Sequence, residues 1–162
     1  MTGPQLTVAA LDAAHDRIGF ECGTPALDRY LRETVTQDVR RRVAACFVML
    51  EGNIVAGYYT LSAASIALAD LPHEMARKLP RYPAIPAVRM GRLAVDRRYR
   101  GRGLGAALLV NALRRAASSE IPAVALTVDA KDKGAATFYE HFGFQSLTHD
   151  PLALFLPLAT VK

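Results

Sequence analysis

A six-residue turn, RGRGLG from Arg100 to Gly105, limits the folds that are open to this chain. It lies between an apolar, strand-like stretch at residues 88–96 and a stretch at residues 104–118 whose apolar residues recur at helical spacing. Glycines let backbone amides approach a ligand without interference from a Cβ, and a helix start adds unpaired N–H donors and a positive dipole end. The turn therefore predicts an anion site suited to a pyrophosphate, with a plain arginine-rich turn as the alternative.

The turn differs from two other phosphate-binding patterns. Gly101, Gly103 and Ala106 satisfy the loose Gly-x-Gly-x-x-Ala fingerprint of dinucleotide-binding folds. The turn, however, lies about two-thirds along the chain, which leaves too few residues for the rest of a doubly wound sheet, and the charged segment DRRYR separates it from its strand. A Walker-type phosphate loop is excluded because no Gly-Lys-Ser/Thr follows.

The order of expected strands and helices along the chain predicts a mixed α/β sheet. Length predicts one domain over residues 1–162, without repeats or linkers. Helices are expected at 24–41, with Thr24 as N-cap, at 73–78, at 104–118, and at 134–142, where Gly143 ends the helix. Strands are expected at 5–11, 46–50, 54–62, 88–96, 121–128 and 152–157, with the second and third joined as a hairpin.

Composition narrows the class of protein. Hydrophobic residues make up 51% and charged residues 22%, which is typical of a soluble globular protein. No apolar run approaches the roughly 20 residues of a membrane span, and the first twenty residues do not resemble a signal peptide, so we expect a cytoplasmic protein. Cys22 and Cys46 are expected to be reduced, partly buried thiols, and no cysteine or histidine spacing predicts a metal.

The net charge of +5 comes from clustered cations, which suits an anionic ligand or partner. Charge runs are more often only a solvated face. One cluster is Arg40 to Arg42; a second leads into the glycine turn and contains Arg77, Lys78, Arg81, Arg89 and Arg92. Cofactor phosphates would account for a few of these cations, and a polyanion such as tRNA for the rest.

Two motifs resemble landmarks of the GNAT acetyltransferases. The run GRLAVDRRYRGRGLGAALL resembles the signature that wraps the pyrophosphate of acetyl-CoA after the fourth strand, and FYEHFGF at residues 138–144 resembles the aromatic landmark near the C-terminus. The resemblance implies a GNAT fold, with a mixed, mostly antiparallel sheet flanked by helices, and acetyl-CoA as co-substrate. It implies cofactor contacts at Leu93, Ala94, Val95, Arg100, Gly101, Arg102, Gly103, Leu104, Gly105 and Phe138, although the side chain of Phe138 is expected in the core.

A narrower resemblance covers nearly the whole chain. The segments FECGTPALDRYL, GYYTLSAASI, LPRYP, VDAKDKGAATFYEHFGF and LFLPL resemble the acetyltransferase toxins of bacterial toxin–antitoxin modules. Members of that family acetylate the α-amino group of aminoacyl-tRNA and so block translation. The resemblance also implies a homodimer and a ribbon-helix-helix antitoxin as partner.

The resemblance implies a role for Tyr139 as the acid that protonates the departing thiolate, with aromatic packing at a helix face as the alternative. A tyrosine with a pKa near 10 remains protonated at pH 7 and can supply that proton. Backbone N–H groups of Leu93 and Val95 are expected to polarise the carbonyl by family pattern, with ordinary strand pairing as the alternative.

The predicted fourth strand contains no carboxylate to act as general base, and Asp96 at its end is expected to cap or to form a salt bridge. An α-amino group titrates near 8, so a useful fraction is neutral without a base, whereas a lysine side chain is not. The missing base therefore agrees with an α-amino acceptor.

Contacts with tRNA phosphates are assigned to Arg77, Lys78, Arg81, Arg89 and Arg92, although each one alone is more often solvated. Arg40 to Arg42 suit either tRNA or an acidic antitoxin segment. Two other functions stay open from the sequence: a GNAT enzyme acting on a small amine or a protein N-terminus, and a non-catalytic GNAT-like binding module.

Overall fold

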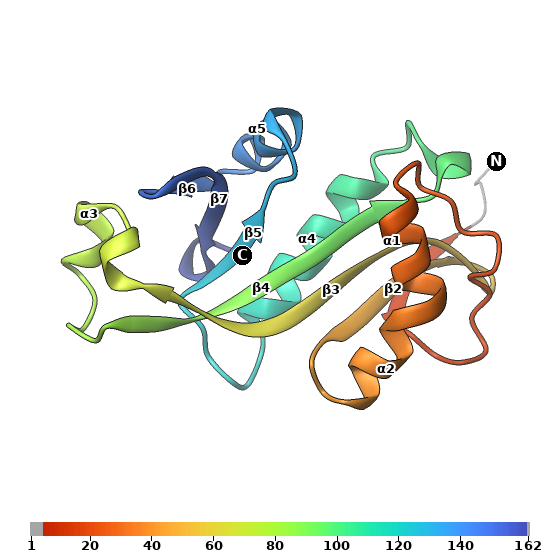
Figure 1. Cartoon of the computed structure of the whole chain (residues 1–162), viewed down its shortest axis with the longest axis horizontal. Helices are drawn as coiled ribbons and strands as arrows, with labels where there is room; N and C mark the ends of the chain where they lie inside the picture. Colours follow the sequence, from red (N-terminus) through yellow and green to blue (C-terminus); the bar gives the residue numbers. More distant parts are fainter. Residues whose placement is uncertain (1–4, 162) are drawn as a thin grey trace. The chain divides into compact units, whose positions relative to one another are not determined.

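Seven strands form the sheet of this protein, described for residues 5–161 in a computed structural model. Their order is β1-β2-β3-β4-β5-β7-β6 (Figure 1). β4 and β5 pair in parallel, whereas the β1–β2, β2–β3, β5–β7 and β6–β7 pairs are antiparallel. The strands are β1 Leu6–Ala10, β2 Ala45–Glu51, β3 Ile54–Ala67, β4 Ala84–Val95, β5 Ala125–Asp129, β6 Gln145–Leu147 and β7 Asp150–Pro157. The predicted mixed, mostly antiparallel sheet is confirmed.

The helices interleave with these strands along the chain. The α-helices are α1 Pro25–Arg29, α2 Val35–Arg40, α3 His73–Ala76, α4 Leu104–Ala117 and α5 Lys133–His141. A π-helical segment, η1 Tyr30–Thr34, joins α1 to α2, and short 3-10 segments are η2 Leu68–Asp70, η3 Arg97–Tyr99 and η4 Leu158–Thr160.

The described chain divides into two compact units. Unit 1 comprises residues up to 62 together with 91–112, and unit 2 comprises residues 63–90 together with 113 onward. The long strands β3 and β4 each contribute to both units.

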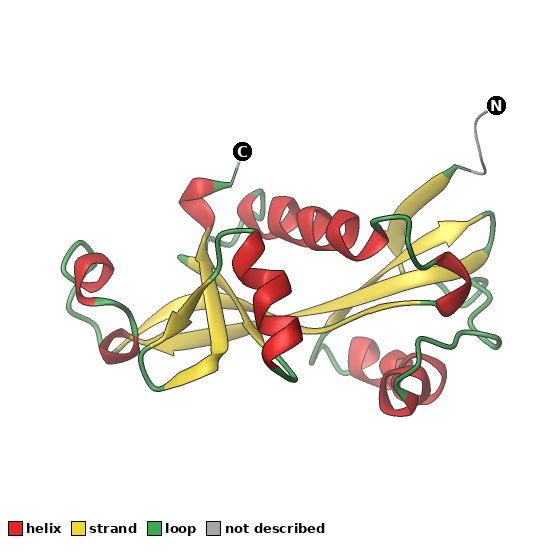
Figure 2. Ribbon diagram, turned by 90° about the horizontal axis from the view of Figure 1, so that it is seen from above, coloured by secondary structure: helices red, strands yellow, loops and turns green. Residues whose placement is uncertain are grey.

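Unit 1 packs helices against both faces of its strands. Figure 2 shows α1 and α2 on one face and the first turns of α4 on the other. Gly57 of β3 permits this close packing, because a Cβ there would lie 2.8 Å from Leu108 Cδ1 and 3.0 Å from the Ala94 carbonyl oxygen. The core beneath α1 and α2 includes Phe20, Leu31, Val35, Val48, Val55 and Tyr58.

Unit 2 contains its own apolar cluster. Asp132 caps α5 by accepting a hydrogen bond from the Ala135 N–H at 2.8 Å, and Gly143, at φ 98°, ends the helix as predicted. The buried cluster comprises Ile66, Leu71, Ile85, Ala87, Ala125, Leu147, Ala153 and Phe155.

Thr24 is the N-cap residue of α1, as predicted: its carbonyl accepts from the Leu27 N–H at 3.0 Å, although its side chain makes no capping hydrogen bond. Two details of the strands differ from the prediction. The predicted strand at 121–128 begins at Ala125, since Pro122 has no N–H for a strand ladder and Ile121 is 79% exposed. The short strand β6 was missed because Gln145 and Ser146 give no apolar alternation.

Candidate active site

The glycine turn of unit 1 has the backbone that its sequence predicts. Asp96 caps η3 by accepting from the Arg98 N–H at 2.8 Å, and the chain then passes through Gly101 at φ 80° and Gly103 at φ 72° into α4. A Cβ added at either glycine would meet nothing within 4 Å. Glycine is therefore required here for conformation, and the backbone faces open space in which a ligand can approach.

The first turn of α4 opens directly from this backbone. Its earliest N–H groups precede the helical ladder, which begins with Ala107 donating to the Gly103 carbonyl at 3.1 Å. The helix contributes a positive dipole end at the same place. Arg102 lies over the Tyr99 ring at 5.4 Å, and Arg100 donates to the Cys22 carbonyl at 2.5 Å. The geometry suits a pyrophosphate.

The backbone at the end of β4 is the second predicted cofactor element. The register between β4 and β5 runs from Ala87–Ala125 to Met90–Val128, so Leu93, Ala94 and Val95 lie beyond the last of these pairs. Ala94 is buried, and Leu93 and Val95 are half-buried. Unit 1 thus contains the β4 end and the glycine turn together.

Tyr139 and Phe138 lie on α5 in unit 2. The Tyr139 ring packs edge-on against Phe138 at 5.3 Å and tilted against Phe144 at 5.4 Å. Tyr139 is 9% exposed, and burial raises the pKa of its hydroxyl to about 12. Phe138 is only half-buried, so the expectation that its side chain lies in the core was too strong.

The predicted phosphate-contact residues separate into three groups. In unit 2, Arg77 and Arg81 line one shallow cavity of about 300 Å³, and Lys78 is exposed beside them. Arg89, on β4, pairs with Asp129. Arg92 belongs to unit 1, where its guanidinium carbon lies 3.5 Å from the centroid of the Tyr30 ring.

Two buried carboxylates belong to the surroundings of the glycine turn. Asp96, 1% exposed, has the capping and salt-bridging role predicted for it, since Arg98 Nε lies 3.0 Å from its Oδ1. Burial opposes ionisation of Asp96, but hydrogen bonds from Arg98 and the Glu21 N–H outweigh that effect and hold its pKa below the usual value. Asp28, 4% exposed, was not predicted as a site residue, because its burial and its bond to the Cys22 N–H are visible only in the structure.

The two cysteines, Cys22 and Cys46, are free thiols, and both are buried. Within residues 5–161, no group of three or more His, Cys, Asp or Glu side chains could hold a metal ion. No helix in this part of the chain is both long and apolar enough to cross a membrane.

A glycine turn of this form between a strand and α4, in a mixed seven-stranded sheet, defines an acyl-CoA-binding type of α/β protein. The sequence model described as the Acetyltransferase (GNAT) family matches residues 14–144, and this chain belongs to that family. The predicted fold and class of enzyme, an acetyl-CoA-dependent N-acetyltransferase, are confirmed.

Curated relatives are described as toxins. The chain is 39% identical over 145 residues to the "tRNA-acetylating toxin" of Mycobacterium tuberculosis (strain ATCC 25618 / H37Rv), covering 88% of this chain and 86% of that protein. It is 33% identical over 159 residues to "Probable toxin TacT" of Sinorhizobium fredii (strain NBRC 101917 / NGR234), covering 91% and 88%. These findings confirm the resemblance to the acetyltransferase toxins.

Solved structures of related toxins have the same fold as this chain. AtaT complexed with acetyl-methionyl-tRNAfMet is 32% identical, with a TM-score of 0.91 and 97% of both chains covered. A tyrosine-to-phenylalanine variant of KacT is 30% identical, with a TM-score of 0.90 and 97% of both chains covered. AtaTR bound with AcCoA is 33% identical, with a TM-score of 0.83 and coverage of 96% and 95%.

Proposed function

We propose that this protein transfers the acetyl group of acetyl-CoA to the α-amino group of aminoacyl-tRNA and thereby blocks translation. The observation that carries the proposal is the open, positive-φ glycine turn at the start of α4, in a chain 39% identical to a tRNA-acetylating toxin. Residues 1–162 form one catalytic domain in this proposal.

The glycine turn would hold the pyrophosphate of acetyl-CoA. Gly101 and Gly103 expose backbone N–H groups without a Cβ, and Leu104 and Gly105 begin the helix whose N–H groups precede the ladder. Arg100 and Arg102 would add charge-assisted hydrogen bonds. At the end of β4, the backbone of Leu93, Ala94 and Val95 would lie along the acyl arm and polarise the thioester carbonyl.

Tyr139 would supply the proton that the departing thiolate needs. The amine nitrogen forms a bond to the acetyl carbon, the C–S bond breaks, and the phenol protonates the sulfur. The amine loses a proton to solvent, and the phenolate regains one from solvent. The apolar surroundings of Tyr139 raise its pKa to about 12. At this pKa the phenol keeps its proton at neutral pH, so a proton is present for the departing thiolate.

The tRNA would meet four exposed cations of unit 2 and Arg92 of unit 1. Arg77, Lys78 and Arg81 carry their charge on the segment that follows α3, where solvent-exposed side chains can reach phosphates. Arg89 would contribute through a guanidinium already oriented by Asp129. Arg92, packed on Tyr30, would present a fixed cation on β4.

The cellular setting follows from the same proposal. A toxin of this kind needs a partner that restrains it, and we assign a ribbon-helix-helix antitoxin to that role, with a homodimer as the working form and the cytoplasm as its compartment. A variant of the relative AtaT has been solved bound to the C-terminus of the antitoxin AtaR.

Transfer of radiolabelled acetyl from acetyl-CoA to total charged tRNA, beside the same tRNA deacylated, tests the proposal. We expect label on the charged pool alone, lost on mild alkaline deacylation. Label in neither pool, from protein that still binds acetyl-CoA, would contradict the aminoacyl-tRNA substrate and direct attention to small amines and protein N-termini. Failure to bind acetyl-CoA at all would contradict the proposal that the protein is an acetyl-CoA-dependent enzyme.

A further inference from the structure

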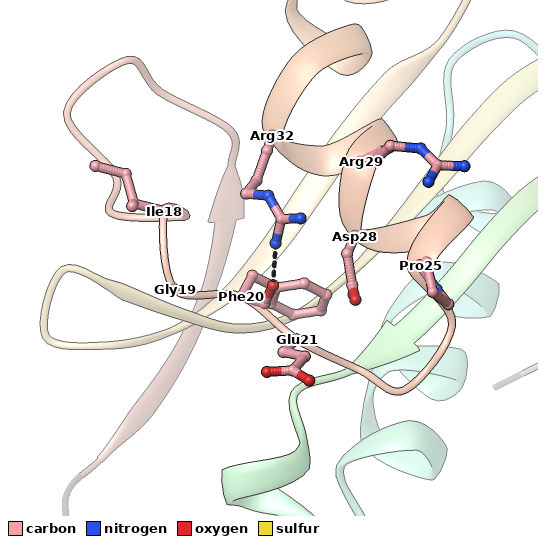
Figure 3. Close-up of a pocket in the computed structure, with 8 residues that line it drawn as sticks. All are labelled: Ile18, Gly19, Phe20, Glu21, Pro25, Asp28, Arg29 and Arg32. Carbon is pink, nitrogen blue, oxygen red and sulfur yellow. Dashed lines mark hydrogen bonds between the residues drawn. The ribbon is translucent and has the colours of Figure 1, made fainter.

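The loop before α1 is held by side chains of the helix that follows it. The Asp28 carboxylate accepts a hydrogen bond from the Cys22 N–H at 2.8 Å, and the Arg32 guanidinium donates to the Phe20 carbonyl at 2.5 Å. Figure 3 shows both side chains reaching from the helix toward this loop. Because a buried carboxylate must find donors, Asp28 fixes the loop backbone rather than merely facing it.

The same loop is joined to the segment that leads into the glycine turn. The Glu21 N–H donates to Asp96 Oδ2 at 3.0 Å, and the Glu21 carbonyl accepts from the Arg97 N–H at 2.9 Å. One residue later, the Cys22 carbonyl accepts from Arg100 Nη2 at 2.5 Å. Two segments more than seventy residues apart in sequence are thus bonded residue by residue within unit 1.

Gly23 is the point at which this arrangement depends on the absence of a side chain. Its φ is 95°, and a Cβ built there would lie 2.7 Å from Arg100 Nη2. The conformation favours glycine, and so does the position of the guanidinium. Since that guanidinium is the flexible end of a side chain, a methyl group at position 23 would displace Arg100 rather than break the core.

We propose that Gly23 and Asp28 are positioning residues for acetyl-CoA, because they set the loop whose Cys22 carbonyl holds the Arg100 side chain beside the Gly101–Gly103 turn. The inference rests on the proposed function of that turn. Arginine carries five N–H donors, so the bond to Cys22 leaves others for a phosphate. An arginine held in place beforehand loses less conformational freedom when it binds.

Calorimetric binding of acetyl-CoA to Gly23→Ala and Gly52→Ala tests the proposal. Gly52 is the matched control, because its φ is also positive, at 59°, but a Cβ there meets nothing within 4 Å. We expect Gly23→Ala to raise the Kd for acetyl-CoA about tenfold, the size of one charge-assisted hydrogen bond, and Gly52→Ala to change it less than about twofold. Binding of acetylpantetheine, which has no pyrophosphate, should not change in either variant.

A double-mutant cycle separates positioning from general damage. In an Arg100→Ala background, Gly23→Ala should weaken acetyl-CoA binding by less than about twofold, because the displaced group is gone. Independent, multiplying effects of the two substitutions would overturn the proposal, as would equal losses for acetyl-CoA and acetylpantetheine. Wild-type protein that does not bind acetyl-CoA would instead contradict the proposed function itself.

Asp28 is tested by graded substitution. Asp28→Asn keeps an acceptor oxygen for the Cys22 N–H and should stay within about threefold of wild type, whereas Asp28→Ala should resemble Gly23→Ala. Wild-type affinity in a folded Asp28→Ala protein would remove Asp28 from the proposal. If Asp28→Ala does not fold, the double-mutant cycle of Gly23→Ala and Arg100→Ala tests the proposal.

Discussion

The guanidinium carbon of Arg92 lies 3.5 Å from the centroid of the Tyr30 ring. Tyr30 is buried, and its hydroxyl donates to Asp38 Oδ2 at 2.8 Å. Burial, together with that hydrogen bond, raises the pKa of Tyr30 to about 12, so the ring stays neutral at physiological pH. Arg92 therefore has a packing role inside unit 1 as well as a charge to present.

Replacing Arg92 should consequently cost stability. We expect Arg92→Ala to lower the free energy of unfolding by about 1–2 kcal/mol, the range of a partly desolvated cation–π contact. Arg77→Ala is the matched control: its guanidinium pairs with exposed Glu74, and we expect a change within about 0.5 kcal/mol. Urea denaturation followed by circular dichroism measures both, and equal unfolding midpoints would contradict the packing role.

Asp96 should make the protein sensitive to acid. Its pKa is lowered in the folded state, so its stabilising contribution is present above the unfolded value of about 3.9 and is lost as the pH falls through the folded value. We expect Asp96→Asn to destabilise the protein by about 1–3 kcal/mol at pH 7 and by clearly less near pH 3. Unfolding free energies at both pH values test this, and a penalty independent of pH would contradict the assigned hydrogen bonds.

Arg42 occupies a backbone position that suits glycine. Among the non-glycine residues of 5–161, only Arg42 has a positive φ, which is 64°. The Val43 N–H donates to the Asp38 carbonyl at 2.9 Å, a hydrogen bond typical of a helix C-terminus. We expect Arg42→Gly to raise the free energy of unfolding by about 1 kcal/mol.

Arg41→Gly is the control for that substitution, since Arg41 has a helical backbone at φ −80°. It should destabilise the protein by about 0.5–1 kcal/mol. Thermal unfolding would show the two midpoints moving in opposite directions; a drop for both would mean that the left-handed conformation of Arg42 carries no strain.

The fold was largely predictable because strong local patterns coincide with its main elements. Leu104, Leu108, Ala112 and Leu113 recur at helical spacing, and all four are buried on α4. The glycine turn was equally readable, since Gly101 and Gly103 both require positive φ. Patterns of this kind depend on residues close in sequence.

What the sequence could not predict depends on contacts between distant segments. No local pattern indicates that the Cys22 carbonyl holds Arg100, or that Asp96 accepts from Glu21. In the sequence, Arg92 is one cation among several. Only its packing on Tyr30, seen in the structure, distinguishes it from the exposed arginines. The role of Gly57 likewise follows from the close approach of Leu108 on α4.

The acid role of Tyr139 and the identity of the acceptor can be tested in one measurement. Charged tRNA is incubated with acetyl-CoA and protein, digested with nuclease, and the released aminoacyl-adenosine is analysed by mass spectrometry. Wild-type protein should yield the N-acetyl derivative. Tyr139→Phe should form it about 10²–10⁴-fold more slowly with unchanged acetyl-CoA affinity, and Tyr82→Phe, at a 64% exposed position, should match wild type. Equal rates for wild type and Tyr139→Phe, or aminoacyl-adenosine that stays unmodified with wild-type protein, would contradict the account.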